Sequence, residues 1–140
     1  MSQIYEWITK DSISADLEAG SKEKIIENLV KLLKNTKRVI DSSLVETDIL
    51  QRENVASTQI SPQLTVPHAH TEGVSDFCVS LGIVNKKEIF MLIAWNNMGY
   101  KNLKTLAKLI ECVNDDLVKS AILSAKDSGE IYDIITDALS

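Results

Sequence analysis

The sequence predicts an α/β fold in which helices cover both faces of a β-sheet, and three observations support this prediction. The segment from Glu88 to Trp95 is an almost continuous apolar run of strand length, which is typical of a central strand covered on both faces. Residues 74–83 are mostly β-forming and are bounded by Gly73 and Asn85, so they predict a neighbouring strand. Apolar residues at helical spacing precede and follow this pair of strands.

The N-terminal part of the chain contains one well-defined helix. Apolar residues recur at helical spacing over residues 25–33, with Lys and Glu opposite them, and Ser21 is a suitable N-cap. Residues 4–9 fit a short helix or a strand equally well. Residues 13–17 alternate loosely before Gly20, which favours a short strand or an extended arm.

A second helix is predicted over residues 44–52, because Ser43 and Glu46 have the spacing of a capping box. The polar residues 53–63 then form a connection. They lead the chain to a brief extended segment at residues 63–66.

Three helices are predicted to complete the chain after residues 96–99 break the central strand. Their apolar residues recur at helical spacing over residues 103–114, 117–125 and 129–139. Ser128 is a suitable N-cap for the last of them. Since no repeat, low-complexity tract or linker divides the sequence, we expect one domain over residues 1–140.

The composition is that of an ordinary globular protein, with 44% hydrophobic and 25% charged residues. A net charge of −5 and a pI of about 5.0 argue against nucleic-acid binding. Cys78 and Cys112 lack C-x-x-C spacing, which favours free thiols in a reducing compartment and leaves a disulfide open. Neither a secretory leader nor a membrane-length apolar run is visible, so we expect a cytoplasmic protein without membrane insertion.

Both histidines of the chain fall in the run VPHAH at residues 66–70. Pro67 keeps Val66 extended, and residues 69–72 carry turn and helix-start residues. A histidine at such a junction meets backbone N–H groups and the positive end of a helix, an arrangement that suits a phosphate. Because a neutral imidazole is a nucleophile near pH 7, His68 is a candidate functional residue. Two ordinary surface histidines are the alternative interpretation.

Other chemistries lack their sequence signatures. His68, His70 and Cys78 do not have the number and spacing of ligands that a stable zinc site needs, so no metal is expected. The sequence contains no nucleophile elbow, P-loop or dinucleotide fingerprint, so no cofactor is expected. Considered alone, Arg52 is a solvated charge at a helix end and Thr58 is a loop residue.

Considered together, RENVAST at residues 52–58 and LTVPH at residues 64–68 resemble the signature of the type-2 enzyme IIA domains. These are the fructose- and mannitol-class members of the bacterial phosphoenolpyruvate-dependent sugar phosphotransferase system (PTS). Their signature runs Arg-Glu, a short gap, Ser-Thr-Gly, a Gly-rich turn and small-apolar-Pro-His. The helices that begin near Ser21, Asn102 and Glu130 are also similar to the family, so the resemblance spans roughly residues 13–139.

The resemblance implies a three-layer α/β/α sandwich with a mixed central sheet of about four to five strands. It also implies a phosphotransferase that works as a phosphocarrier. His68 would accept a phosphoryl group from phospho-HPr and pass it to a cysteine of enzyme IIB for sugar uptake. Arg52 would hold phosphate oxygens with its planar bidentate fork, and Thr58 would add a hydrogen bond.

The sequence departs from the family pattern at three places. Residues 59–63 replace the Gly-rich turn, residues 84–88 shorten the connection between the two central strands, and Asn102 stands where the family has a second active-site histidine. Asn102 can donate a hydrogen bond to phosphate but cannot carry a charge, and His70 is a candidate substitute for the missing imidazole. The missing histidine and the shortened connection favour a regulatory module, whose phosphorylation state or mere presence controls a partner protein, as the alternative to sugar transport.

Overall fold

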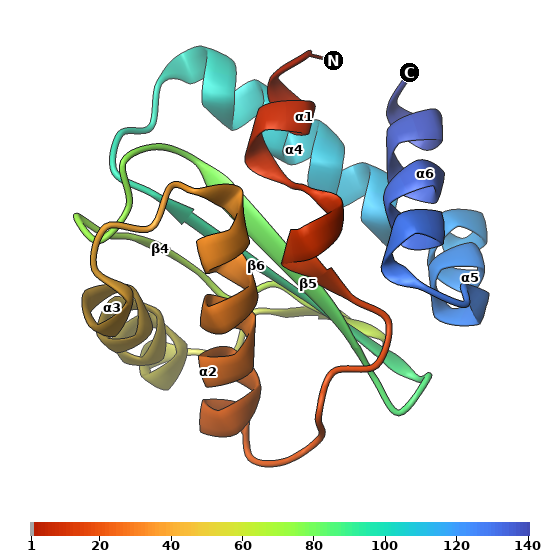
Figure 1. The fold of residues 1–140 in the computed structure, drawn as a ribbon, viewed down its shortest axis with the longest axis horizontal. Coiled ribbons are helices and arrows are strands. Elements are labelled where there is room, and N and C mark those ends of the chain that lie inside the picture. Colours follow the sequence, from red (N-terminus) through yellow and green to blue (C-terminus); the bar gives the residue numbers. More distant parts are fainter. Residues whose placement is uncertain (1) are drawn as a thin grey trace.

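The computed structural model describes residues 2–140, which form a six-stranded sheet between two layers of helices (Figure 1). The strand order is β1-β5-β6-β3-β2, and β4 also pairs with β6. The strands are β1 (Ile13–Ser14), β2 (Gln59–Ser61), β3 (Leu64–Thr65), β4 (His68–His70), β5 (Cys78–Val84) and β6 (Glu88–Trp95). The predicted three-layer α/β/α sandwich is confirmed. Its sheet has more strands than expected because very short segments pair at its edges.

The sheet is mixed because its two long strands are antiparallel and most of the short strands add to them in parallel. The turn of the β5–β6 hairpin places Asn85 and Lys86 at φ 56° and 58°, as a type I′ turn requires. β1 pairs in parallel with β5, while β3 and β4 pair in parallel with successive parts of β6. β2 forms a small antiparallel hairpin with β3. The histidine run therefore lies at an edge, beside the end of the central strand.

Six α-helices within residues 2–140 cover the two faces of the sheet (Figure 1). α2 (Lys22–Leu33) and α3 (Ser42–Val55) pack on one face. The helices on the other face are α1 (Ser2–Trp7), α4 (Tyr100–Asn114), α5 (Asp116–Ser124) and α6 (Ser128–Leu139). Short 3-10 helices span Lys10–Ser12 and Lys34–Thr36. Over the described residues, none of the helices is long and apolar enough to cross a bilayer.

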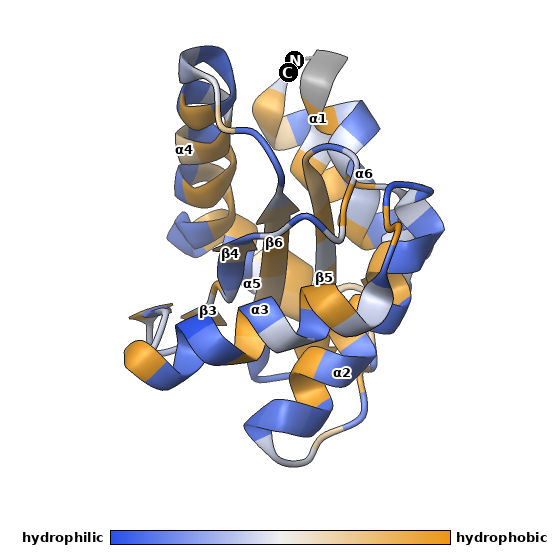
Figure 2. Cartoon of the chain, turned by 90° about the vertical axis from the view of Figure 1, so that its left-hand side faces the viewer, coloured by the Kyte–Doolittle hydropathy of each residue, from blue (hydrophilic) through white to orange (hydrophobic). Residues whose placement is uncertain are grey.

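The central strand β6 is buried on both faces, as its apolar sequence predicts. Side chains alternate between the faces of a strand. Ile89, Met91 and Ile93 belong to the core beneath α1, α4 and α6, whereas the core beneath α2 and α3 contains Phe90, Leu92 and Ala94. Figure 2 shows the two long strands coloured hydrophobic between helices that carry both colours. One strand therefore supplies both cores of the molecule.

Helix caps differ from the prediction at two of the three predicted positions. Ser21 caps α2 as predicted. α3 is capped by Asp41 rather than by Ser43, because the Asp41 carboxylate accepts the Leu44 N–H at 3.1 Å. α6 is likewise capped by Asp127, one residue before the predicted cap. In both cases an aspartate upstream of the predicted serine accepts a free N–H of the first turn, so the helix begins one or two residues earlier than predicted.

The prediction that residues 69–72 begin a helix is wrong, and this difference matters most for the site. His68–His70 form β4, in which Ala69 lies opposite Ala94 of β6. The Thr71 N–H donates to the carbonyl of Trp95 at 2.8 Å, which continues the pairing beyond the strand. These partners satisfy the backbone groups that a helix would otherwise have satisfied. His68 therefore lies on a strand and does not meet a helix N-terminus of its own segment.

Two segments that the sequence left open are now defined. α1 (Ser2–Trp7) makes residues 4–7 helical, and Ile4 and Trp7 are buried in the core. Residues 13 and 14 form the short strand β1. The polar connection at residues 53–63 is not wholly irregular, because it extends α3 to Val55 and contains β2.

Candidate functional site

A cavity of about 570 Å³ opens at the sheet edge where β4 meets α3. The cavity combines cationic, acidic, apolar and aromatic side chains from three elements. Its lining consists of Asp48, Gln51, Arg52 and Val55 of α3, His68, Ala69 and His70 of β4, and Trp95 at the end of β6. Three of the five residues predicted for the site, Arg52, His68 and His70, are thus brought together.

The two histidines share one side of β4. Ala69, between them, is buried in the core beneath α2 and α3. Because successive side chains of a strand point to opposite faces, His68 and His70 both point away from that core. His68 is half-buried and His70 is exposed. The run HAH therefore presents two imidazoles to the cavity at its rim.

The ring of His68 is held by the backbone. Its Nδ1 lies 2.8 Å from the carbonyl oxygen of Val66. A carbonyl can only accept a hydrogen bond, so Nδ1 carries the proton and Nε2 of the neutral ring carries the free lone pair. The imidazole also stacks on Trp95, with ring centroids 6.1 Å apart and planes 18° apart. Two contacts thus fix the ring and leave Nε2 as its nucleophilic atom.

Arg52 supplies the cation on the α3 side of the cavity. Its Nη1 donates a 3.1 Å hydrogen bond to the carbonyl oxygen of Ala56, just beyond the end of α3. This bond uses one of the five N–H donors of the guanidinium. Arg52 therefore remains able to bind oxygen atoms of an anion in the cavity.

His70 is positioned by two oxygen atoms. Its Nε2 lies 3.0 Å from the carbonyl oxygen of Asn96 and 3.5 Å from Oε1 of Glu72. These two contacts hold the His70 imidazole at the rim of the cavity.

Thr58 lies outside the cavity lining, and its hydrogen bonds hold the loop that follows α3. Its hydroxyl donates a 2.8 Å hydrogen bond to Oε2 of Glu53, and its N–H donates to Oε1 at 3.2 Å. Lys22 Nζ contacts the same carboxylate at 2.9 Å. Burial opposes ionisation of Glu53, but the hydrogen bonds from Lys22 and Thr58 hold its pKa below the ordinary value. The Thr58 carbonyl in turn accepts the N–H of Val66 at 3.1 Å.

Asn102 also lies outside the lining. It is half-buried in the first turn of α4, on the other helical layer from Arg52.

Sequence reasoning missed two residues that matter for the site. Glu53 belongs to the Arg-Glu pair of the matched block, and that pairing was a usable signal. Trp95 ends the apolar run, and nothing in its sequence context pointed to His68.

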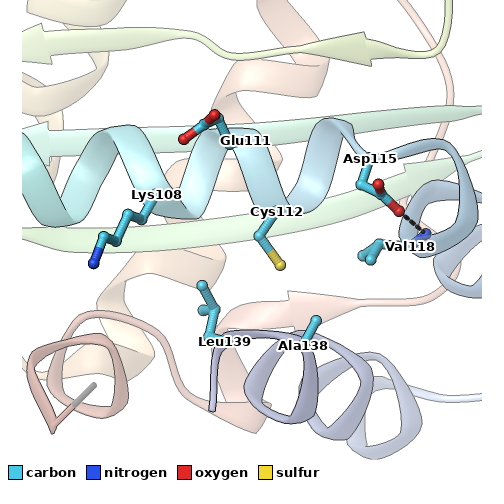
Figure 3. Close-up of a pocket in the computed structure, with 7 residues that line it drawn as sticks. All are labelled: Lys108, Glu111, Cys112, Asp115, Val118, Ala138 and Leu139. Carbon is cyan, nitrogen blue, oxygen red and sulfur yellow. Dashed lines mark hydrogen bonds between the residues drawn. The ribbon is translucent and has the colours of Figure 1, made fainter.

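A second cavity, of about 440 Å³, lies between α4, α5 and the end of α6 (Figure 3). Cys112 points into it, and burial followed by the Asp115 charge raises the pKa of this thiol, which therefore stays protonated. Cys78 is fully buried, and desolvation raises its pKa to about 12. Both cysteines are free thiols. Residues 2–140 contain no cluster of three His, Cys, Asp or Glu side chains that could hold a metal.

Comparison with solved structures identifies the fold. The chain matches the nitrogen regulatory protein IIA-Ntr from Neisseria meningitidis with a TM-score of 0.80 at 19% identity, over 95% of this chain and 99% of that one. It matches enzyme IIA of mannitol from Escherichia coli, solved with phosphorylated IIB, with a TM-score of 0.76 at 16% identity, over 93% and 97% of the two chains. At these identities the likeness shows the fold alone, an α/β domain that those two proteins share.

The family follows from the sequence match. Residues 6–138 match the family described as "Phosphoenolpyruvate-dependent sugar phosphotransferase system, EIIA 2", and the chain belongs to this family. It is therefore a phosphotransferase component of the PTS, as the resemblance implied.

Two curated relatives carry PTS names. The chain is 26% identical over 147 residues to the fructose-specific EIIABC component of Bacillus subtilis, which covers 95% of this chain and 23% of that protein. It is 24% identical over 139 residues to the fructose-specific EIIA component of Haloferax volcanii, which covers 91% and 90% of the two proteins. The chain thus spans less than a quarter of the first relative and nearly all of the second.

Proposed function

We propose that this chain is a phosphocarrier in which Nε2 of His68 accepts a phosphoryl group from phospho-HPr and passes it to enzyme IIB. The observation that carries the proposal is the 2.8 Å contact between His68 Nδ1 and the Val66 carbonyl. It places the ring proton on Nδ1 and leaves Nε2 as the nucleophile. The curated EIIABC relative joins the A component to B and C components, which supports a IIB acceptor.

The transfer consists of two balanced steps. In the first step a P–N bond to His68 Nε2 forms while the P–N bond of phospho-HPr breaks. In the second step the phosphoryl group passes to a thiolate of IIB and the neutral imidazole of His68 is the leaving group. Such transfers require positioning and charge stabilisation more than covalent chemistry from the protein. The cavity needs to hold only a phosphoryl group, because the sugar reacts on a different component.

Two side chains of the cavity support this role. Arg52 offers a planar fork for phosphoryl oxygens from the α3 side, and His70 offers a second donor from β4. Asp48 lines the same cavity, so the Arg52 guanidinium also offsets a local negative charge. We assign no phosphate contact to Thr58, whose hydroxyl and N–H are used by Glu53, or to Asn102, which lies outside the lining.

Labelling tests the proposal directly. Incubation with phosphoenolpyruvate, enzyme I and HPr should add one acid-labile phosphate per chain. His68→Ala should remain unlabelled, whereas His70→Ala should still be labelled, although more slowly. Labelling of His68→Ala would refute the assignment. In the wild-type protein, NMR coupling between phosphorus and the ring nitrogens should place the phosphoryl group on Nε2.

A regulatory role is the second candidate, and two observations favour it. Asn102 replaces a second imidazole of the family, and the fold matches a nitrogen regulatory IIA protein with a TM-score of 0.80. Phosphotransfer to IIB separates the candidates. A phosphocarrier for transport should lose its phosphate to a IIB protein of the same genome within seconds. A regulatory module should keep it, and should bind a partner protein in only one phosphorylation state.

A further inference from the structure

Four aromatic rings lie nearly parallel in a row that ends at His68, and we call this row the aromatic column. Trp7 and Phe77 stack with centroids 4.5 Å apart and planes 16° apart. Phe77 and Trp95 follow at 5.8 Å and 15°, and Trp95 and His68 at 6.1 Å and 18°. The column joins α1, the residue before β5, the end of β6 and β4. Only the folded chain brings these four segments together.

The inner end of the column is buried in the core. Trp7 is 3% exposed and Phe77 is fully buried, and both belong to the core beneath α1 and α4. Close packing holds such rings in one rotamer. Trp95 is half-buried, packs against that core and lines the His68 cavity. It therefore connects a fixed core ring to an imidazole at the surface.

His68 needs such a connection because one hydrogen bond does not define the plane of a ring. The 2.8 Å contact with the Val66 carbonyl fixes Nδ1, but the ring can still swing about that atom. The terminal torsion of a histidine side chain is broad and does not restrain the ring by itself. Stacking on Trp95 restrains the plane. The two contacts together determine where Nε2 points.

We propose that Trp95 is a positioning residue for phosphoryl transfer, which keeps the His68 imidazole aligned with the Val66 carbonyl and Nε2 aimed into the cavity. This inference rests on the proposed role of His68. Trp95 contacts no reacting atom and acts only through the imidazole. Without the indole, the ring leaves the Val66 carbonyl for part of the time, and the tautomer that is protonated on Nε2 becomes populated. That tautomer cannot attack a phosphoryl group through Nε2.

The first experiment measures the tautomer in the unphosphorylated protein. Nitrogen-15 NMR of the His68 ring distinguishes protonation on Nδ1 from protonation on Nε2. Wild type and Trp95→Phe, which keeps a stacking ring, should show one dominant tautomer with Nδ1 protonated. Trp95→Leu, which keeps apolar volume without a ring, should show a mixture. Should the leucine variant fail to fold, Trp95→Met replaces it, since it also lacks a ring.

The second experiment measures single-turnover phosphorylation by saturating phospho-HPr. Trp95→Leu should slow the transfer step roughly tenfold or more, because small misplacements of reacting atoms are costly. Trp95→Phe should recover most of the rate. Tyr100→Leu is the matched control, because Tyr100 is an aromatic residue of α4 with 81% exposure that lies outside the column. Its loss should change neither the rate nor the tautomer.

The outcomes separate this inference from the proposed function. Wild-type tautomer and wild-type rate in a folded Trp95→Leu would overturn the role of Trp95 while leaving His68 as the acceptor. A slower rate with an unchanged tautomer would also overturn it, since the effect would then not pass through the imidazole. Failure of wild-type His68 to accept phosphate would refute the proposed function instead, and the tautomer measurement would still decide whether Trp95 orients the ring.

Discussion

The hydroxyl of Thr58 donates a 2.8 Å hydrogen bond to the buried carboxylate of Glu53, which anchors the loop before the histidine strand on the last turns of α3. The Thr58 carbonyl then accepts the N–H of Val66, whose own carbonyl holds His68. Four residues thus form a hydrogen-bonded path from the interior to the imidazole. Glu53 affects the site without lining the cavity.

Glu53→Gln should destabilise the fold. The amide retains the shape of the side chain but loses the charge that Lys22 and both donors of Thr58 contact. Weakening charge-assisted hydrogen bonds at a buried acceptor costs about 1–3 kcal/mol of unfolding free energy. Urea unfolding at pH 7 measures this loss of unfolding free energy. The matched control is Glu46→Gln, a half-buried position on the same helix, where a change below about 0.5 kcal/mol is expected.

The difference in unfolding free energy between wild type and Glu53→Gln should depend on pH in one direction. The folded pKa of Glu53 is depressed, so on acidification the unfolded chain takes up this proton before the folded chain does. The contribution of Glu53 is therefore complete above the ordinary glutamate pKa of about 4.3, and is lost as the pH falls through the folded pKa. The stability gap between wild type and Glu53→Gln should therefore stay constant from pH 7 to about pH 5 and narrow as unfolding is repeated below about pH 4.3. A gap that widens on acidification would contradict this account.

Arg52→Lys should slow phosphorylation of His68 while leaving the fold intact. An ammonium group replaces a bidentate fork with a point charge, so one charge-assisted hydrogen bond to the phosphoryl group is lost. At about 1.5–3 kcal/mol, this loss corresponds to a rate lower by roughly one to two orders of magnitude. Rapid-quench labelling by phospho-HPr measures it. Transfer at the wild-type rate would reduce Arg52 to a solvated charge at the end of α3.

His70→Gln should lower the equilibrium level of phospho-His68 in exchange with HPr. The His70 imidazole lines the cavity together with His68 and Arg52 and is held by Asn96 and Glu72. Glutamine retains a donor, but its flexible side chain does not hold that donor where the ring does. The equilibrium constant should be measured at pH 7.

Asn102 supplies the comparison for that measurement. Because Asn102 lies outside the cavity lining, Asn102→Ala should leave the equilibrium between phospho-HPr and phospho-His68 unchanged. Installing an imidazole with Asn102→His should shift it less than removing the imidazole of His70 does. The reverse order would mean that α4 closes on the phosphoryl group and that His70 does not serve as the second imidazole.

Gly73→Ala should destabilise the fold by about 1–3 kcal/mol, because overpacking shifts backbone. A Cβ on Gly73 would lie 2.7 Å from the Asp41 carbonyl oxygen and 2.7 Å from Cγ2 of Val45, at the start of α3. Thermal and urea unfolding measure the effect. Gly20→Ala is the control, since its new Cβ would meet only Lys24 at an ordinary 3.5 Å, and unfolding should change little. Equal effects at the two glycines would remove close packing as the cause.

The sequence by itself determined those helices and strands whose apolar pattern and caps lie within their own residues. β6 matches the prediction because a strand buried on both faces must be apolar throughout. α2 matches because its apolar stripe and the Ser21 cap are local features. The RENVAST and LTVPH blocks identified the family for a similar reason, since a family signature is written in consecutive residues.

Tertiary structure alone decided the conformation and surroundings of the histidine run. His68–His70 form a strand because β6, about 25 residues further along the chain, satisfies their backbone, whereas local sequence favoured a helix start. The same pairing brings Trp95 beside His68, and the packing of α3 brings Arg52 to the cavity while leaving Asn102 outside its lining. Contacts between residues far apart in the chain depend on register and packing, which no window of the sequence contains.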